Sequence, residues 1–348
     1  MRPLRILTWH IHGSYLYYLA HCRQEFYLPV KPGRPDGYYG RTPSYPWPAN
    51  VQEVPAEEVR NLDLDCVLFQ SRKNYLEDQY DILSPEQQRL PRIYLEHDPP
   101  QEHPTNTRHI VDDPDVLLVH VTPFNNLMWD SGRTPTRVID HGVVVPEGVR
   151  YTGELERGIV VVNNLGRRGR RLGADVFARA AKEVPLDLVG MGWREVGGIG
   201  EVSHFELPAF EARYRFFFNP IRYTSLGLAV CEAMMVGMPV LGLATTEMVT
   251  AVENGVSGYL ETDVGRLIGH MKRLLADPAE ARRLGEGARR RAQERFAIGR
   301  FVRDWDQTFA LVTDLRGLTP PAQLRGLTPP APSAAVKPRE LERVGGTA

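Results

Sequence analysis

The residues of this chain best suited to chemistry lie within segment 219–260. A short loop with a glycine at position 227 comes directly before an apolar run that is typical of a helix and carries Glu232. A glycine-bearing loop that leads into a helix presents unpaired backbone N–H groups and the positive end of a dipole, which favour a phosphate or diphosphate. The Glu232 carboxylate, further along the same unit, can accept hydrogen bonds from ribose hydroxyls. The segment therefore predicts one half of a nucleotide-binding site. Its candidate donor-binding residues are Ser225, Leu226, Gly227, Leu228 and Glu232.

A second candidate group is basic. Four arginines occupy the positions 167, 168, 170 and 171, shortly after a predicted strand. Guanidinium groups at the carboxyl end of a strand can clamp a diphosphate, because their geometry matches that of phosphate oxygens. We assign Arg167 and Arg171 to the phosphates, and a solvated basic loop is the alternative. Gly190, in a Gly-x-Gly sequence after the next predicted strand, allows a tight turn beside the nucleotide.

Two histidines of the first half lie near the ends of predicted strands. His97 follows the apolar run 92–96 and could hydrogen-bond a sugar hydroxyl in an interdomain cleft, and a structural histidine is the alternative. For His12, contact with either substrate and an ordinary loop position are equally open. A metal site at Asp98 and its neighbours is not expected, because two consecutive prolines prevent a helical arrangement of ligands there. No HExxH motif or paired cysteines are present either.

The elements that must position these residues follow an alternating pattern. Apolar strand-like runs alternate with helical segments, which indicates parallel sheets with crossover helices. The predicted strands are 5–10, 66–70, 92–96, 116–121, 137–140, 158–162, 186–189, 216–219 and 239–243. The predicted helices are 173–183, 227–236, 264–276, 278–295 and 300–313. Segment 28–50, rich in Pro, Gly and Tyr, is expected to be an ordered surface excursion outside the sheet.

Length and composition agree with this pattern. A chain of 348 residues is too long for one typical core, so we expect two domains, with a boundary near 144–151. A net charge of −1 gives no reason to expect nucleic acid or an anionic membrane as a partner. Cys22, Cys66 and Cys231 lack metal-binding spacing and are typical of reduced thiols. We find no signal peptide or membrane-spanning run, so the predicted location is cytoplasmic. The tail 315–348 repeats LRGLTPPA and is expected to be disordered.

These motifs also carry a family resemblance. Segment 220–240, PIRYTSLGLAVCEAMMVGMPV, resembles the donor-site signature of the GT-B glycosyltransferases of family four, the group 1 glycosyl transferases, which use nucleotide sugars. The residues that match in order and spacing are Pro220, Gly227, Leu228, Glu232, Ala233, Met234, Gly237, Pro239 and Val240. The sequence ENGVSGYL at 253–260 is similar to a downstream element of the family. The resemblance covers most of 135–313 strongly and 1–134 weakly.

The resemblance implies an α/β fold of the GT-B type. Two Rossmann-like domains would face each other across a cleft, and a C-terminal helix would cross back to the first domain. We expect an acceptor domain at 1–147, a donor domain at 148–298 and the returning helix at 299–314, followed by the tail at 315–348.

The resemblance also implies roles for single residues. Members of the family have two Glu residues eight positions apart, of which the first contacts the transferred sugar and the second holds the ribose. The first falls on Thr224 here and the second on Glu232, so Thr224 and His97 are the predicted catalytic residues. Gly13 lies where the family has a Gly-rich loop facing the donor, and His12 is placed on the acceptor side. A third acidic position of the family falls on Glu247.

The predicted function is transfer of a sugar from a nucleotide-diphosphate donor, a UDP or GDP sugar, with retention of configuration. The acceptor would be a small molecule, a glycan or a lipid-linked molecule of bacterial polysaccharide or glycoconjugate synthesis, and contact with a membrane surface is left open. No cofactor or metal is expected, since members of this family neutralise the diphosphate with basic residues and helix termini. Two alternatives remain: a sugar-nucleotide epimerase on the same scaffold, and a catalytically silent GT-B module that binds a nucleotide.

Overall fold

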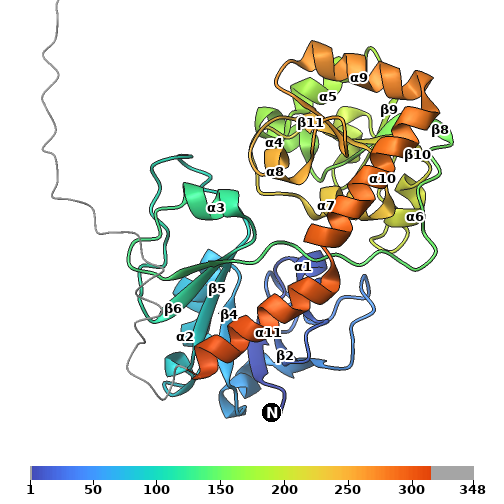
Figure 1. Ribbon diagram of the computed structural model, residues 1–348. Coiled ribbons are helices and arrows are strands. Elements are labelled where there is room, and N and C mark those ends of the chain that lie inside the picture. Colours follow the sequence, from blue (N-terminus) through green and yellow to red (C-terminus); the bar gives the residue numbers. More distant parts are fainter. Residues whose placement is uncertain (1, 315–348) are drawn as a thin grey trace, which may run out of the picture.

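The chain folds around two parallel β-sheets (Figure 1). The computed structural model describes residues 2–314, so the predicted disorder of the tail 315–348 concerns residues outside the described part. The first sheet has seven strands in the order β3-β2-β1-β4-β5-β6-β7, and the second has five in the order β12-β11-β10-β8-β9. All pairings within both sheets are parallel. The prediction of two Rossmann-like α/β units is confirmed.

The strands of the first sheet are β1 (Arg5–Thr8), β2 (Glu25–Val30), β3 (Val51–Pro55), β4 (Cys66–Phe69), β5 (Arg92–Glu96), β6 (Val116–His120) and β7 (Thr136–Val138). Those of the second sheet are β8 (Leu155–Val161), β9 (Leu186–Val189), β10 (Tyr214–Asn219), β11 (Val240–Leu243) and β12 (Gly258–Glu261). Most of these strands lie where the apolar runs predict them. The expectation for 28–50 is partly wrong, because β2 reaches Val30 and pairs with β3, so these two strands extend the sheet at one edge.

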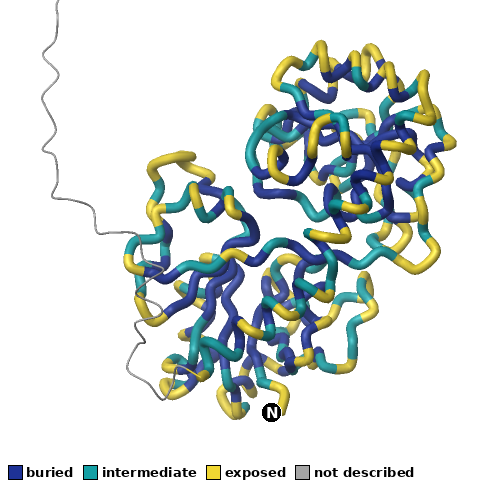
Figure 2. Tube along the Cα trace, viewed as in Figure 1, coloured by how far each residue is buried: buried dark blue, intermediate teal, exposed yellow. Residues whose placement is uncertain are grey.

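The helices of the first domain are α1 (Gly13–Leu19), α2 (Gln79–Ile82) and α3 (Pro123–Met128). The second domain carries α4 (Leu165–Leu172), α5 (Ala174–Ala180), α6 (Leu207–Glu211), α7 (Leu228–Val236), α8 (Met248–Ala251), α9 (Val264–Ala276) and α10 (Pro278–Arg295). The basic segment 167–171, for which a solvated loop is the alternative interpretation, is helical in α4, although Gly169 interrupts this helix with φ 56°. Each of the two lobes has a buried centre, visible as dark blue in Figure 2.

The last helix, α11 (Ile298–Asp314), runs across the first domain and not the second (Figure 1). Its Trp305 is fully buried and donates a hydrogen bond from Nε1 to the Tyr15 hydroxyl at 3.1 Å. Gln24 donates from its side-chain amide to Asp306 Oδ1 at 2.7 Å. A Cβ atom on Gly142 would lie 2.2 Å from Phe301 of α11, so only glycine lets the linker pass this helix.

Candidate functional site

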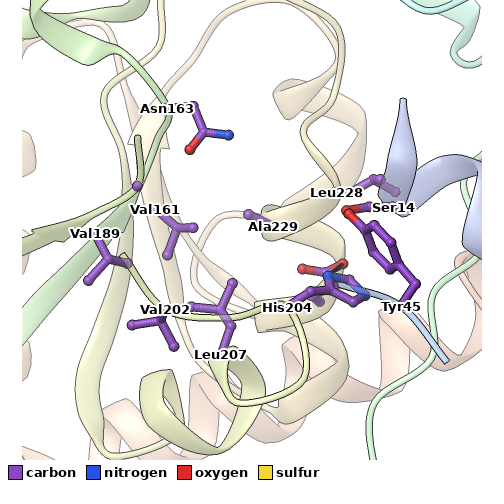
Figure 3. A pocket seen from close by; sticks show the side chains of 12 residues that line it. Ser14, Tyr45, Val161, Asn163, Val189, Val202, His204, Leu207, Leu228 and Ala229 are labelled. Atoms are coloured by element: carbon purple, nitrogen blue, oxygen red, sulfur yellow. Dashed lines mark hydrogen bonds and ion pairs between the residues drawn. The ribbon is translucent and has the colours of Figure 1, made fainter. Parts of the chain in front are cut away.

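A cavity of about 320 Å³ lies between the two domains. Its lining residues are Ser14 and Tyr45 from the first domain and Val161, Asn163, Val189, Gly190, Val202, His204, Leu207, Leu228, Ala229 and Glu232 from the second. Figure 3 shows valine and leucine side chains along one side and Tyr45 beside His204 on the other. An apolar slot with a few polar groups at its edge is the usual form of a small-molecule site.

Glu232 is the acidic group of this cavity. It lies on α7, is 4% exposed, and accepts a hydrogen bond on Oε1 from the Tyr18 hydroxyl of α1 at 2.6 Å. His204 Nδ1 is 4.0 Å from the same oxygen. Burial raises the pKa of Glu232, while His204 and the Tyr18 hydrogen bond act in the opposite direction. The carboxylate therefore depends on its few neighbours to remain charged.

A second buried carboxyl, Glu211, lies at the end of α6 behind this site. It is 0% exposed, and neither of its oxygens has a hydrogen-bond partner within residues 2–314. Burial raises its pKa well above the usual value, and the charge of Glu232 adds to this effect. Ionisation of one carboxyl makes ionisation of the other less favourable. Glu232, which has a hydrogen-bond donor, is better placed to carry the charge than Glu211, which has none among the described residues.

The loop before α7 places backbone groups at the cavity. Gly227 is the N-cap, and its carbonyl accepts from the Val230 N–H at 3.1 Å. The N–H groups of Leu228 and Ala229, both cavity-lining residues, have no hydrogen-bond partner in the described part of the chain. Unpaired amides at a helix N-terminus are suited to a negative group.

The other predicted residues of this loop lie outside the cavity lining. Ser225 and Leu226 are buried, and the Leu226 carbonyl accepts a hydrogen bond from His141 Nε2 at 2.8 Å. Thr224 is half-buried, and its side chain has no hydrogen bond among the described residues. These positions shape the loop from behind and leave the Thr224 hydroxyl available.

Three arginines of α4 have no carboxylate partner among residues 2–314: Arg167, Arg168 and Arg171. Between residues 2 and 314 none of their side chains forms an ion pair or hydrogen bond, whereas Arg170 pairs with Asp175 at 2.7 Å. Burial lowers the pKa of Arg168, and the charge of Arg171 lowers it further, while Asp98 of the first domain raises it. The charge of Arg168 is therefore influenced by the other two arginines and by the opposite domain. None of the three side chains is part of the cavity lining.

The two predicted histidines of the first domain are brought together. The rings of His12 and His97 have their centroids 3.9 Å apart. Burial is the main cause that holds the pKa of His97 well below its usual value, with the charges of His12 and His141 next. Burial likewise lowers the pKa of His12, although Asp98 opposes this. Both rings are therefore neutral near pH 7.

Gln70 determines which nitrogen of His97 carries the proton. Its amide nitrogen donates to the Trp9 carbonyl at 2.9 Å, so its oxygen is the atom that faces His97 Nε2 at 3.2 Å. Because an amide oxygen only accepts, Nε2 must be the donor. The Nδ1 atom of His97 then remains as an acceptor, and it has no partner among the described residues.

At two of the predicted positions, Gly13 and Gly190, a side chain would clash with neighbouring atoms. A Cβ on Gly13 would lie 2.8 Å from the ring of Tyr45, so this glycine lets Tyr45 reach the cavity. Gly190 has φ 137°, and a Cβ there would lie 2.6 Å from the Val162 carbonyl oxygen. Gly190 lines the cavity, whereas Gly13 lies behind it.

Glu247, which falls on a third acidic position of the resembled family, has other partners here. Its Oε1 pairs with Arg295 Nη2 at 2.6 Å, and its Oε2 accepts from the Phe124 N–H of the first domain at 2.9 Å. It is 1% exposed. Its carboxylate is thus saturated by protein groups.

Comparison with known proteins shows which proteins have a similar sequence or fold. A family model described as "Glycosyl transferase-like" matches residues 167–307. Sucrose-phosphate synthase from Thermosynechococcus elongatus superposes with a TM-score of 0.64 at 16% identity, over 90% of this chain and 100% of that chain. HepE from Anabaena, in complex with UDP and glucose, gives 0.63 at 14%, over 88% and 100%. The chain has the GT-B fold, and its second domain is glycosyl transferase-like.

Other relatives of this GT-B fold are larger. The pneumococcal O-GlcNAc transferase GtfA, in complex with UDP and GlcNAc, has a TM-score of 0.54 at 14% identity, over 71% of this chain and 56% of that chain. A search of curated proteins finds no sequence match.

Four residues of the site were not predicted from the sequence: Tyr18, Tyr45, His204 and Arg168. Arg168 belonged to the recognised basic run, and its spacing to Arg171 (i, i+3) would have suggested one helical face.

Across residues 2–314 no group of three metal-ligating side chains is assembled, and no helix is both long and apolar enough to cross a bilayer.

Proposed function

We propose that this protein transfers a sugar from a nucleoside-diphosphate sugar to an acceptor hydroxyl. The observation that carries the proposal is a cavity edge with a buried Glu232 and two free amides at the start of α7. Helix α4, whose three arginines have no partners among residues 2–314, begins two residues after the cavity-lining Asn163. Solved GT-B structures with 14% identity were obtained with UDP and glucose, and with UDP and GlcNAc. These groups would bind two parts of the donor, the ribose and the diphosphate, and the apolar side of the cavity would hold the base.

In the proposed reaction the bond between the sugar anomeric carbon and the diphosphate oxygen breaks. A bond from the acceptor oxygen to that carbon forms, and the proton of the acceptor hydroxyl passes to the departing diphosphate. Negative charge grows on the departing diphosphate, so the main catalytic task is to stabilise it with fixed positive groups. We assign this task to Arg167, Arg168 and Arg171 and to the amides of Leu228 and Ala229.

The remaining predicted residues receive roles within the same proposal. His97 Nδ1 and the Thr224 hydroxyl would contact the transferred sugar, and His12 would face the acceptor. No metal or cofactor is included. Several finer points remain predictions: retention of configuration, a UDP or GDP donor, transfer of a hexosyl group, a role in bacterial polysaccharide or glycoconjugate synthesis, and a cytoplasmic location.

The test is a binding and turnover screen. We would measure the affinity of the full chain for UDP, GDP, ADP and their sugars by calorimetry, and then the release of free sugar from each ligand that binds. Glu232→Gln should weaken the tightest ribonucleotide by about 10- to 100-fold, because hydrogen bonds to a charged acceptor contribute roughly 1.5–3 kcal/mol.

The matched control is Glu280→Gln, since Glu280 also accepts a hydrogen bond from a tyrosine of the second domain, Tyr259, at 2.9 Å. This variant should bind nucleotides as the wild type does. No nucleotide binding by the wild type would reject the proposal. Binding without sugar release or transfer in the presence of candidate acceptors would favour the catalytically silent module.

A further inference from the structure

The first domain touches the acidic group of the nucleotide cavity through a single hydroxyl. Tyr18, on α1, donates to Glu232 Oε1 at 2.6 Å, although these residues lie 214 positions apart in the chain. Both are buried, with 1% and 4% of their surface exposed. Burial, followed by the charge of Glu232, raises the pKa of Tyr18 well above its usual value, so this hydroxyl remains a donor at all working pH values.

The surroundings of Glu232 make this one donor important. The titratable groups that face it from other elements are Tyr18 from α1, Tyr45 from the loop between β2 and β3, His204 from the loop before α6, and Glu211 from α6. His204 Nδ1 is 4.0 Å from Oε1, beyond hydrogen-bond distance, and its Nε2 lies 3.3 Å from the Tyr18 hydroxyl. Glu211, an acid, offers no countercharge. A carboxylate removed from water needs hydrogen bonds to stay ionised. The Tyr18 hydroxyl is the short bond that meets this need among the described residues.

The two oxygens of Glu232 are therefore unequal. Oε1 is occupied, while Oε2 accepts no hydrogen bond from residues 2–314 and is not among the buried polar atoms that lack a partner. Because Glu232 lines the cavity, Oε2 is the oxygen left for a ligand. Fixing one oxygen of a carboxylate also fixes the direction of the other.

We propose that Tyr18 is a positioning residue for ribose recognition: its hydroxyl holds Glu232 through Oε1 and presents Oε2 to the ribose diol of a ribonucleotide. The inference rests on the proposed function, because it requires a nucleotide in this cavity. It makes the ribose site a product of both domains, since the donor domain alone lacks the group that holds its acid. Ribose affinity is then linked to the approach of α1 to α7.

The experiment combines one conservative variant with one ligand change. Tyr18→Phe removes only the hydroxyl, and its folding is checked by thermal unfolding. Calorimetry would compare the tightest binder among UDP, GDP and ADP with its 2′-deoxy form. We expect Tyr18→Phe to weaken the ribonucleotide about tenfold and the 2′-deoxy nucleotide clearly less. That difference is a coupling between Tyr18 and the ribose hydroxyl, which a general packing defect would not produce.

A pH series adds a second readout. Ribose binding needs ionised Glu232, so affinity should fall as the pH decreases. Without the Tyr18 hydrogen bond, the carboxyl takes up its proton more readily, and in Tyr18→Phe this fall should begin at a higher pH than in the wild type.

The control variant is Tyr259→Phe, which removes the other tyrosine-to-glutamate hydrogen bond described above and should leave nucleotide affinity and its pH dependence unchanged. Equal weakening of the ribonucleotide and its 2′-deoxy form would overturn the inference. Tighter binding by Tyr18→Phe would also overturn it, since Tyr18 would then compete with the ribose. If wild-type protein binds none of the nucleotides, both the inference and the proposed function fail; binding that needs Glu232 but not Tyr18 rejects the inference alone.

Discussion

Two charged regions lie where the domains meet, and they are built in opposite ways. In the first, the Arg295 cluster, Arg295 binds Asp140 through two bonds of 3.0 Å and Glu247 through one of 2.6 Å. In the second, the α4 arginines (Arg167, Arg168 and Arg171) have no acid partner within residues 2–314. Charges that are saturated by protein groups hold the domains together, whereas charges left open beside a cavity are suited to a charged ligand.

The strongest test of this contrast is Arg295→Met. The variant leaves Glu247, whose side chain is 1% exposed, without its countercharge. Breaking a buried pair from one side typically costs about 3–5 kcal/mol, so the free energy of unfolding, measured by urea denaturation at pH 7, should fall by about that amount. Arg283→Met, which breaks an exposed pair with Glu280, should cost less than about 1 kcal/mol. Similar small losses in both variants would contradict the assignment of the Arg295 cluster to stability.

The second test moves to the open region. Replacing Arg167, Arg168 and Arg171 together by Met should weaken diphosphate binding about 100-fold, since several charge-assisted hydrogen bonds are lost. The free energy of unfolding should hardly change, because none of the three side chains has a partner to lose. Calorimetry at two salt concentrations measures the first effect and urea denaturation the second. Arg170→Met, which removes an arginine already paired with Asp175, is the control. Unchanged diphosphate affinity in the triple variant would remove the phosphate role.

The smallest expected effect concerns His141, which connects the Arg295 cluster to the loop before α7. It follows Asp140 of the Arg295 cluster, and its Nε2 hydrogen-bonds the Leu226 carbonyl of the cavity loop. Burial is the main cause that lowers its pKa to about 4, so the unfolded chain takes up this proton first as the pH falls. Stability is therefore complete above the unfolded pKa of about 6.5 and decreases between about pH 6.5 and 4, by at most about 1.4 kcal/mol per pH unit.

His141→Gln keeps a donor for Leu226 and removes this titration. Between pH 7 and pH 5 the free energy of unfolding of this variant should therefore fall by about 2 kcal/mol less than that of the wild type. Urea denaturation at both pH values measures the difference, and His103→Gln, at an exposed position, serves as the control. An equal pH dependence in His141→Gln and wild type would show that His141 does not contribute.

The sequence was sufficient for much of the fold because buried parallel strands have continuous apolar runs. Strands β4, β5 and β6 lie within a residue or so of the predicted runs, and α10 begins and ends as predicted. Strands β2 and β3 were missed because Pro29 and Pro55 lie inside them, and proline argues against a strand unless that strand is near an edge. In the sheet β3 is the edge strand and β2 lies next to it. Edge positions cannot be recognised before the order of the sheet is known.

The candidate site was less predictable, for a different reason. Gly190, Leu228 and Glu232 are local to strand and helix ends, and the structure places all three at the cavity. Tyr18 was missed because the bond to Glu232 depends on how two domains that are far apart in the sequence approach each other. A signal for the helix did exist, since Tyr15, Leu16, Tyr18 and Leu19 are buried at helical spacing in α1. The direction of Arg168 depends on the interruption at Gly169, which spacing alone does not give.

The return of α11 has a consequence for biosynthesis. Trp305 and Phe309 of this helix are fully buried against the first domain, yet they follow the whole second domain in the chain. The N-terminus of a chain emerges from the ribosome first, and N-terminal domains generally begin to fold before C-terminal ones. The first domain therefore cannot complete its packing until nearly all of residues 1–314 have been translated. Until then the surface around Tyr15 and Phe26 is not covered by α11. The half that is made first is the half that is finished last.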